Sequence, residues 1–400
     1  MFDQINDEKT LDGRAPRPPA GRAGNSTALS PAMRLLDRYL DDAVAARASD
    51  LHFDPNGSSL SIRARIDGHL ILLEPPPAGV TDAMLTRLRL LAAVDLGHRR
   101  RPQDGRFSFD YSGRQIDVRA AFLPVQGGER ATLRFIDEEA VALELSELGM
   151  PERERTMLER ALDRPGGLTV VSGPTGSGKT TTLYACLQHQ RRTDVSILTV
   201  EDPVERRLEG VAQVGVDDEA DRSFASTLRA MLRHDPDIIM VGEMRDSESA
   251  RIACRAALTG HRVLTTVHAT DSSEVRVRLL DMDVADYLLT ACLRLVVAQR
   301  LVRRLCSNCR KSSSCDAFTQ ALFHSLGKPA PTAVAKPRGC AQCRETGYRG
   351  RMALFELLAF DEAGVARPAP SRSLITAGAD AIADQVTTTR EVLSQCPDPR

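Results

Sequence analysis

The apolar and polar positions along the chain predict segments of different character. Residues 1–30 combine Pro, Gly, Arg and Ala without apolar periodicity, so we expect a disordered tail there. From residue 31 to 142, helically spaced apolar residues are followed by short strand-like runs, a second helical segment and further alternating runs. This mixture predicts a small α+β domain, and residues 143–150 are typical of a linker.

The pattern changes after residue 150. Four runs that are apolar throughout alternate with helical segments; they are LTVVSG, SILTVED, DIIMVGE and RVLTTVH. Continuous apolar runs are typical of parallel strands covered by helices on both faces, so residues 151–305 are expected to form a doubly wound parallel α/β sheet. We expect this part to finish with a long helix ending near Arg304. Residues 306–345 hold paired cysteines, and residues 346–400 lose clear periodicity beyond Phe360.

Composition limits the classes of protein that fit this division. The 400 residues are 42% hydrophobic and 27% charged, which is typical of a globular chain of two or three domains. Lys plus Arg total 53 against 54 Asp plus Glu, so net charge does not draw the chain to nucleic acid or to a membrane surface. We find no membrane-spanning run and no signal-peptide pattern, so we expect a cytoplasmic protein with no nucleic-acid partner.

A phosphate-binding loop is the strongest chemical signal. The segment GPTGSGKT at residues 173–180 fits G-x-x-x-x-G-K-[ST], directly after a strand and before a helix. Its glycines let backbone N–H groups surround a phosphate, Lys179 would reach the β- and γ-phosphates, and Thr180 would hold Mg²⁺. The nucleotide-binding residues are therefore expected to be Gly173, Pro174, Thr175, Gly176, Ser177, Gly178, Lys179, Thr180 and Thr181. The alternative is a glycine-rich turn that binds nothing.

Three titratable residues follow later strands of the same predicted sheet. Glu243 comes directly after the run IIMVG and is a candidate for the metal region, because ligands bind at the carboxyl ends of strands in such sheets. Glu201 ends the run ILTVE and could orient or deprotonate an attacking water; otherwise it is a helix cap or a solvated acid. His268 ends a third run and could sense a phosphate, although a lone histidine is more often structural.

Four of the nine cysteines form two C-x-x-C pairs, Cys306 with Cys309 and Cys340 with Cys343. Four thiolates are typical of a closed, structural zinc site, and redox chemistry is the alternative. Cys315 lies six residues after the first pair and is a possible substitute ligand. The remaining cysteines in helical apolar segments are expected to be core residues; they are Cys186, Cys254 and Cys292.

Several spaced motifs together resemble the ATPases of the type II secretion and type IV pilus assembly family. Besides the phosphate loop, ILTVEDPVE (197–205) is similar to that family's Asp box, and LRAMLRHDPDIIMVGEMRD (228–246) to its Walker B block. ALTGHRVLTTVHATD (257–271) resembles its His box. The segments ASDLHFDP, RIDG, RPQDGRFS and IDVRAAFLPVQGGERATLRF resemble the domain that precedes the ATPase core. The resemblance covers about residues 48–358.

The resemblance implies a RecA-like P-loop ATPase core at 151–305, a PAS-like domain at 31–142 and a tetracysteine zinc module at 306–345. It also implies the cofactors ATP, Mg²⁺ and Zn²⁺, and a homo-hexamer in which the earlier domain contributes arginines to the γ-phosphate. Those arginines would be Arg119 in DVR and Arg134 in TLR.

The predicted function is a hexameric cytoplasmic ATPase that powers pseudopilus or pilus assembly, peripheral to the inner membrane through its platform proteins. Two alternatives stay open. A non-hydrolysing ATP-binding scaffold is suggested because the family's extra N-terminal domain is missing from this sequence and residues 346–400 look like a shortened C-terminal region. A pilus retraction ATPase has a similar core, but members of that group lack the four-cysteine module.

Overall fold

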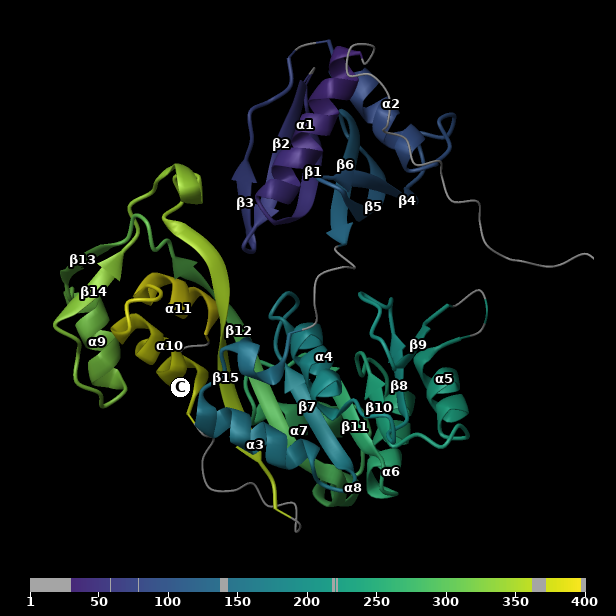
Figure 1. The fold of residues 1–400 in the computed structure, drawn as a ribbon, viewed down its shortest axis with the longest axis vertical. Helices are drawn as coiled ribbons and strands as arrows, with labels where there is room; N and C mark the ends of the chain where they lie inside the picture. Colours follow the sequence, from purple (N-terminus) through teal and green to yellow (C-terminus); the bar gives the residue numbers. More distant parts are fainter. Residues whose placement is uncertain are drawn as a thin grey trace, which may run out of the picture. The chain divides into compact units, whose positions relative to one another are not determined.

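A computed structural model describes residues 30–57, 59–77, 79–136, 143–217, 220, 222–361 and 372–396. The predicted disordered tail at 1–30 lies outside the described residues except for Ser30. The chain divides into two compact units, Met1–Glu138 and Glu139–Arg400 (Figure 1), and each is described here by itself. The stretch predicted as a linker contains a short 3-10 helix, η1 (Leu145–Leu148), that belongs to the second unit.

The described part of the first unit is one antiparallel sheet of six strands with two helices. The strand order is β3-β2-β1-β6-β5-β4. The elements are α1 (Pro31–Ala45), β1 (Ala48–Asn56), β2 (Ser59–Ile66), β3 (His69–Leu72), α2 (Thr81–Leu91), β4 (Gln103–Tyr111), β5 (Arg114–Val125) and β6 (Gly128–Ile136).

One face of this sheet is apolar, because buried and more exposed residues alternate along its strands. In β2, for example, Leu60, Ile62 and Ala64 are buried while their neighbours are partly exposed. These side chains share one core with Leu36 and Leu40 of α1 and with residues of α2, so both helices cover the same face. The N-terminus of α1 has the residues that commonly begin a helix, because the Ser30 side chain accepts a hydrogen bond from Met33 N and Pro31 opens the first turn.

The second unit contains a sheet of seven described strands in the order β15-β12-β7-β11-β10-β8-β9. All neighbours are parallel except β12 and β15. The strands are β7 (Gly167–Ser172), β8 (Ile197–Glu201), β9 (Ala212–Gly215), β10 (Ile238–Val241), β11 (Arg262–Val267), β12 (Leu293–Leu305) and β15 (Tyr348–Ala359). The helices around them are α3 (Glu152–Leu162), α4 (Lys179–Gln190), α5 (Phe224–Met231), α6 (Ser247–Leu258), α7 (Glu274–Asp281) and α8 (Asp286–Cys292).

Helices cover both faces of this sheet. Every residue of β7 is buried, and its side chains alternate between two separate cores: Val170 packs with residues of α5, α6, α7 and α8, whereas Val171 packs with residues of α3 and α4. The continuous apolar runs of the sequence therefore have the predicted cause, burial on both faces. The predicted α/β fold class is confirmed.

The predicted long helix ending near Arg304 is wrong. The chain forms the short helix α8 and then strand β12, which lies between β7 and β15. Central burial explains the error: nine of the thirteen residues of β12 are buried, because the strand carries apolar residues toward both layers of helices. Such a run has no period of two, and a buried helix gives the same pattern.

Beyond β12 the chain continues the second unit. The residues between the two cysteine pairs fold into β13 (Lys311–Ser314), α9 (Ala317–Ser325) and β14 (Ala333–Lys336). In the second pair, Cys340 directly precedes the short helix η3 (Ala341–Cys343) and Cys343 ends it. Two further helices, α10 (Leu374–Ala383) and α11 (Thr389–Gln395), share a core with residues of β12, β15 and α9. Their periodicity was weak because seven of the ten residues of α10 are buried, on all sides of the helix.

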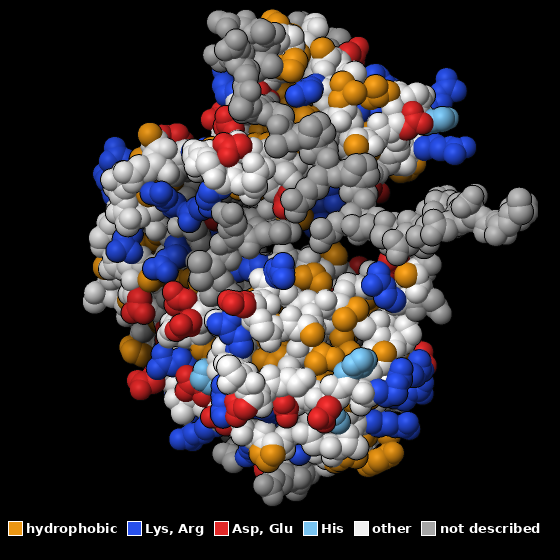
Figure 2. Space-filling view, turned by 45° about the vertical axis from the view of Figure 1, so that its right-hand side comes forward, with side chains coloured by type: hydrophobic (Ala, Val, Ile, Leu, Met, Phe, Trp, Pro, Cys, Tyr) orange, Lys and Arg blue, Asp and Glu red, His pale blue; other side chains and the backbone are white. Residues whose placement is uncertain are grey.

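The surface is consistent with the balanced composition. Figure 2 shows basic and acidic side chains interspersed over the visible face of the molecule. Among the residues that the structure describes, no helix has the length and apolar character needed to cross a membrane.

Candidate nucleotide and metal sites

The loop between β7 and α4 has the backbone form that a phosphate cradle needs. Gly173, Gly176 and Gly178 have φ values of 152°, 78° and 88°, a region that side chains with a Cβ rarely adopt. A Cβ at Gly173 would lie 2.5 Å from the Gln299 carbonyl oxygen, so glycine is required there for space as well. The loop leads directly into the N-terminus of α4, where unpaired N–H groups favour an anion.

Lys179 is the first residue of α4, and its side chain folds back over this loop. Its Nζ donates hydrogen bonds to the carbonyl oxygens of Gly173 at 2.9 Å and Pro174 at 3.0 Å. Burial lowers the pKa of Lys179, and the nearby carboxylate of Glu243 acts in the opposite direction. Thr180 and Thr181 occupy the following positions of the same turn. Glycines, helix N-terminus and amine together fit the phosphates of a nucleotide, with the Thr180 hydroxyl available for Mg²⁺.

Glu201 ends β8 and is 3% exposed, so it is neither a solvated acid nor a helix cap. Its carboxylate accepts hydrogen bonds from Tyr184 Oη at 2.5 Å, Thr199 Oγ1 at 2.6 Å and Gln213 Nε2 at 3.1 Å. Burial, together with the hydrogen bond to Glu201, raises the pKa of Tyr184, so this hydroxyl stays a donor. The three donors fix the orientation of the carboxylate inside the sheet.

Glu243 and His268 lie together at the carboxyl ends of neighbouring strands. His268 Nε2 is 2.9 Å from Glu243 Oε1, and Arg245 Nε donates to Glu243 Oε2 at 2.9 Å. Arg245 also donates to Asp202 Oδ2 at 2.8 Å, so it links the ends of β10 and β8. The hydrogen bond that Arg245 donates to Glu243 is the main reason that the pKa of Arg245 is raised. The structure therefore places Glu243 and His268 in contact, with Arg245 and Asp202 beside them.

One residue at the phosphate loop was missed by sequence reasoning. Gln299 of β12 is 2% exposed, and its amide donates to the Ser177 carbonyl oxygen at 2.8 Å and accepts from Thr182 Oγ1 at 2.7 Å. The misassigned helix concealed it, because a helix there would not have placed β12 beside β7. The available signal was an amide beside Arg300 in the mainly apolar run LVVAQRLV.

The two arginines singled out by the resemblance lie in the first unit. Arg119 of β5 and Arg134 of β6 are directly opposite in the strand register. Arg134 Nε donates to Asp50 Oδ1 at 2.9 Å, and the Asp50 side chain is buried while that of Arg134 is 69% exposed. Each arginine thus has a fixed strand position on the same face of one sheet.

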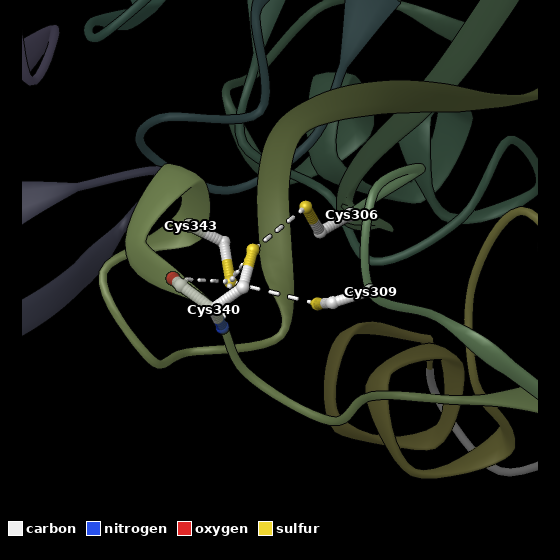
Figure 3. Close-up of side chains that lie close together, drawn as sticks. All are labelled: Cys306, Cys309, Cys340 and Cys343. Carbon is white, nitrogen blue, oxygen red and sulfur yellow. Dashed lines mark hydrogen bonds between the residues drawn. The ribbon is translucent and has the colours of Figure 1, made fainter.

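The four paired cysteines converge on one point, as Figure 3 shows. Their sulfur atoms all lie within 4.8 Å of one another. The separations are 3.9 Å for Cys306 and Cys340, 3.8 Å for Cys309 and Cys343, and 3.7 Å for Cys340 and Cys343. Four sulfurs around Zn²⁺ at ~2.3 Å would be about 3.8 Å apart in a tetrahedron, so the cluster fits that ion.

N–H groups lie within hydrogen-bonding distance of two of the four sulfur atoms. Cys343 Sγ accepts from the backbone N–H groups of Cys340 and Gly347, each at 3.2 Å, and Asn308 Nδ2 lies 3.3 Å from Cys340 Sγ. The Asn308 amide is the main cause that lowers the pKa of Cys340 to about 6, whereas burial raises the pKa of Cys309 to about 11. Donors of this kind orient thiolate ligands and stabilise their charge.

Cys315 is not part of this cluster, so the suggestion that it could be a substitute ligand is wrong. It follows β13, and its thiol lies 3.8 Å from the Asp316 carbonyl oxygen. The fold of the intervening segment carries it away from the pairs. Cys186, Cys254 and Cys292 are fully buried core residues, as predicted, and burial raises the pKa of Cys186 to about 12.

A phosphate loop between a buried strand and a helix, with acids at neighbouring strand ends of a parallel sheet, defines a P-loop nucleotide-binding protein. The family described as "Type II/IV secretion system protein" matches residues 25–393, and the chain belongs to this family. The resemblance seen in the sequence motifs is therefore confirmed.

Relatives and a solved structure agree with this assignment. The chain is 42% identical over 333 residues to the type II secretion system protein E of Pseudomonas aeruginosa, covering 83% of this chain and 66% of that protein. It is 41% identical over 335 residues to the type IV pilus assembly ATPase PilB of Myxococcus xanthus, covering 83% of this chain and 59% of that protein. The chain thus spans less than two thirds of the length of these relatives. The pilus retraction motor PilT with bound ADP has a TM-score of 0.57 and 25% identity, covering 91% of this chain and 97% of PilT.

Proposed function

We propose that this chain is a Mg²⁺-dependent ATPase whose hydrolysis powers assembly of a pseudopilus or pilus. The observation that carries the proposal is the phosphate loop of β7 and α4, in the same sheet as strand ends that hold Glu201, Glu243 and His268. Membership of the Type II/IV secretion system family supports it, and so do relatives that bear the names of secretion and pilus ATPases.

The chain's own residues would divide the work of phosphoryl transfer. The loop N–H groups and Lys179 bind the β- and γ-phosphates, and Lys179 exchanges its two loop carbonyl partners for phosphate oxygens. Bound Mg²⁺ supplies positive charge that neutralises the phosphates, and Thr180 would hold it with Glu243 nearby. Glu201 orients or deprotonates the attacking water from a carboxylate that its three donors hold still.

Arg119 and Arg134 would add fixed positive charge to the γ-phosphate, as the resemblance to the family implies. Negative charge on the phosphoryl oxygens is stabilised most by cations that are already in place. This role of the two arginines is tested by measuring kcat for ATP hydrolysis in Arg119→Ala and Arg134→Ala.

The apparatus is proposed from the relatives. The chain would act as a homo-hexamer in the cytoplasm, at the inner membrane through the platform proteins of a type II secretion or type IV pilus system. The mass of the purified protein in MgATP tests the hexamer. Hydrolysis of ATP by that preparation separates a motor from a non-hydrolysing scaffold.

A retraction motor is the second candidate, favoured by the likeness to PilT. The four-cysteine cluster favours assembly, because the retraction ATPases that the sequence resembles lack such a module. Deletion phenotypes distinguish the two: loss of an assembly motor leaves no fibres, whereas loss of a retraction motor leaves fibres that are not cleared.

We also propose that Cys306, Cys309, Cys340 and Cys343 hold one zinc ion per chain in a structural role. With four sulfurs at tetrahedral separations, no position is open for a substrate. The ion would tie the end of β12 to the start of β15 across the β13–α9–β14 segment.

A further inference from the structure

Gln299 is a buried polar side chain that contacts the phosphate loop and that the proposed chemistry does not use. Gln299 lies in the middle of β12. Its Nε2 donates a hydrogen bond to the Ser177 carbonyl oxygen at 2.8 Å, and its Oε1 accepts one from Thr182 Oγ1 at 2.7 Å. One side chain from a neighbouring strand therefore holds both the loop and the first turns of α4. A buried amide with both ends bonded has a single orientation.

The bond to Ser177 has a consequence for the cradle itself. The Ser177 carbonyl belongs to the same planar peptide as the Gly178 N–H, and in a trans peptide the two point in opposite directions. With the carbonyl held toward Gln299, the Gly178 N–H is directed away from β12. Without that bond the peptide plane is free to rotate about the glycine, which has few backbone restrictions.

The contacts of the two flanking glycines show how closely Gln299 meets the loop. A Cβ at Gly178 would lie 2.8 Å from Gln299 Nε2, and a Cβ at Gly173 would lie 2.5 Å from the Gln299 carbonyl oxygen. Gln299 thus contacts the start and the end of the loop. At these positions the glycines leave the space that Gln299 occupies.

We propose that Gln299 is a positioning residue of the nucleotide site, which fixes the Ser177–Gly178 peptide so that its N–H faces the phosphates. This inference rests on the proposed function, because it assumes that the loop binds a nucleotide. It goes beyond that function because it attributes the conformation of the loop to a residue of β12 that is 122 positions from Ser177 in the sequence.

The test replaces Gln299 with methionine, which has a similar shape but cannot form these hydrogen bonds. Loss of one well-formed buried hydrogen bond corresponds to about a tenfold change in an equilibrium constant. We therefore expect Kd for MgADP and for MgATP, measured by calorimetry, to rise about tenfold or more in Gln299→Met. Gln299→Leu also removes both hydrogen bonds without adding a charge, so its affinity should fall similarly, and it serves if the methionine variant does not fold.

A control separates positioning from stability. Gln190→Met removes a comparable buried bond, from Gln190 Nε2 to the Leu162 carbonyl oxygen at 2.7 Å, at the opposite end of α4. It should lower the melting temperature while leaving Kd for MgADP within about twofold of the unmodified protein.

The outcomes are distinct. Weaker nucleotide binding in both Gln299 variants, with near-normal binding in Gln190→Met, supports the positioning role. Wild-type affinity in Gln299→Met, or an equal loss in Gln190→Met, would overturn the inference and leave the proposed function standing. If the unmodified protein binds neither MgADP nor MgATP, the proposed function fails and the inference fails with it.

Discussion

Replacing Cys309 with alanine should remove one of four thiolates and, with it, the proposed zinc ion. The sulfur atom of Cys309 lies 3.8 Å from that of Cys343, within the ~3.8 Å expected around a shared tetrahedral zinc. Three thiolates leave the ion an open position and a weaker site. We expect purified, reduced wild-type protein to contain one zinc per chain, and Cys309→Ala to contain little.

The size of the local effect can be estimated from the structure. The β13–α9–β14 segment contributes few large buried side chains, chiefly Leu322, Phe323 and Val334. Burial of three such side chains stabilises by ~5–9 kcal/mol, whereas structural zinc sites bind with apparent free energies of ~10–16 kcal/mol at neutral pH. Loss of the metal should therefore unfold this segment locally, while the sheet around β7 and β10, which has its own two cores, stays folded.

The assay combines elemental analysis with hydrogen exchange followed by mass spectrometry. Exchange should become fast in peptides from residues 306–347 of Cys309→Ala, and of wild-type protein after chelation, but not in peptides from β7. Cys315→Ala is the matched control, since that cysteine lies between the pairs and outside the cluster. Absence of zinc from fresh, reduced wild-type protein would refute the reasoning, and so would equal zinc loss in Cys315→Ala.

The remaining predictions concern the nucleotide site and its support. Arg119→Ala and Arg134→Ala should each lower kcat about 10²-fold with unchanged zinc content, because both would act on transition-state charge; steady-state assays in which both hydrolyse ATP normally would exclude that role. Tyr184→Phe removes a donor to the buried Glu201 carboxylate and should lower the free energy of unfolding by about 1.5–3 kcal/mol in urea titrations, whereas Tyr287→Phe, at a ring that is 73% exposed, should change it little.

The sequence was most informative where one physical cause sets the pattern. Burial on both faces makes the runs of β7, β8, β10 and β11 continuously apolar, so the parallel sheet could be predicted, and the ends of these strands placed Glu243 beside His268. The glycine requirement of the phosphate loop is equally local. Its φ values and close contacts depend on a few consecutive residues and their nearest neighbour strand.

Elsewhere the pattern was ambiguous for reasons that the structure explains. A strand between two other strands and under two helical layers has no alternation, so the sequence of β12 also fits a helix and does not place Gln299 at the loop. Helix α10 is buried almost all round and therefore lacks a polar face. Arg245 joins Glu243 to Asp202 across two strands, a pairing that depends on strand order and not on sequence distance.

The most direct test of the central claim is steady-state ATP hydrolysis by Lys179→Ala and Glu201→Gln beside the unmodified protein, with MgADP affinity measured on each. The account predicts that Lys179→Ala nearly abolishes turnover. Glu201→Gln should lower turnover about 10²-fold or more while changing MgADP affinity far less, since the carboxylate acts on water and not on the bound phosphates. Glu209→Gln, an exposed acid eight residues further on, is the control and should hydrolyse normally. Undiminished turnover in either Lys179→Ala or Glu201→Gln would contradict the account.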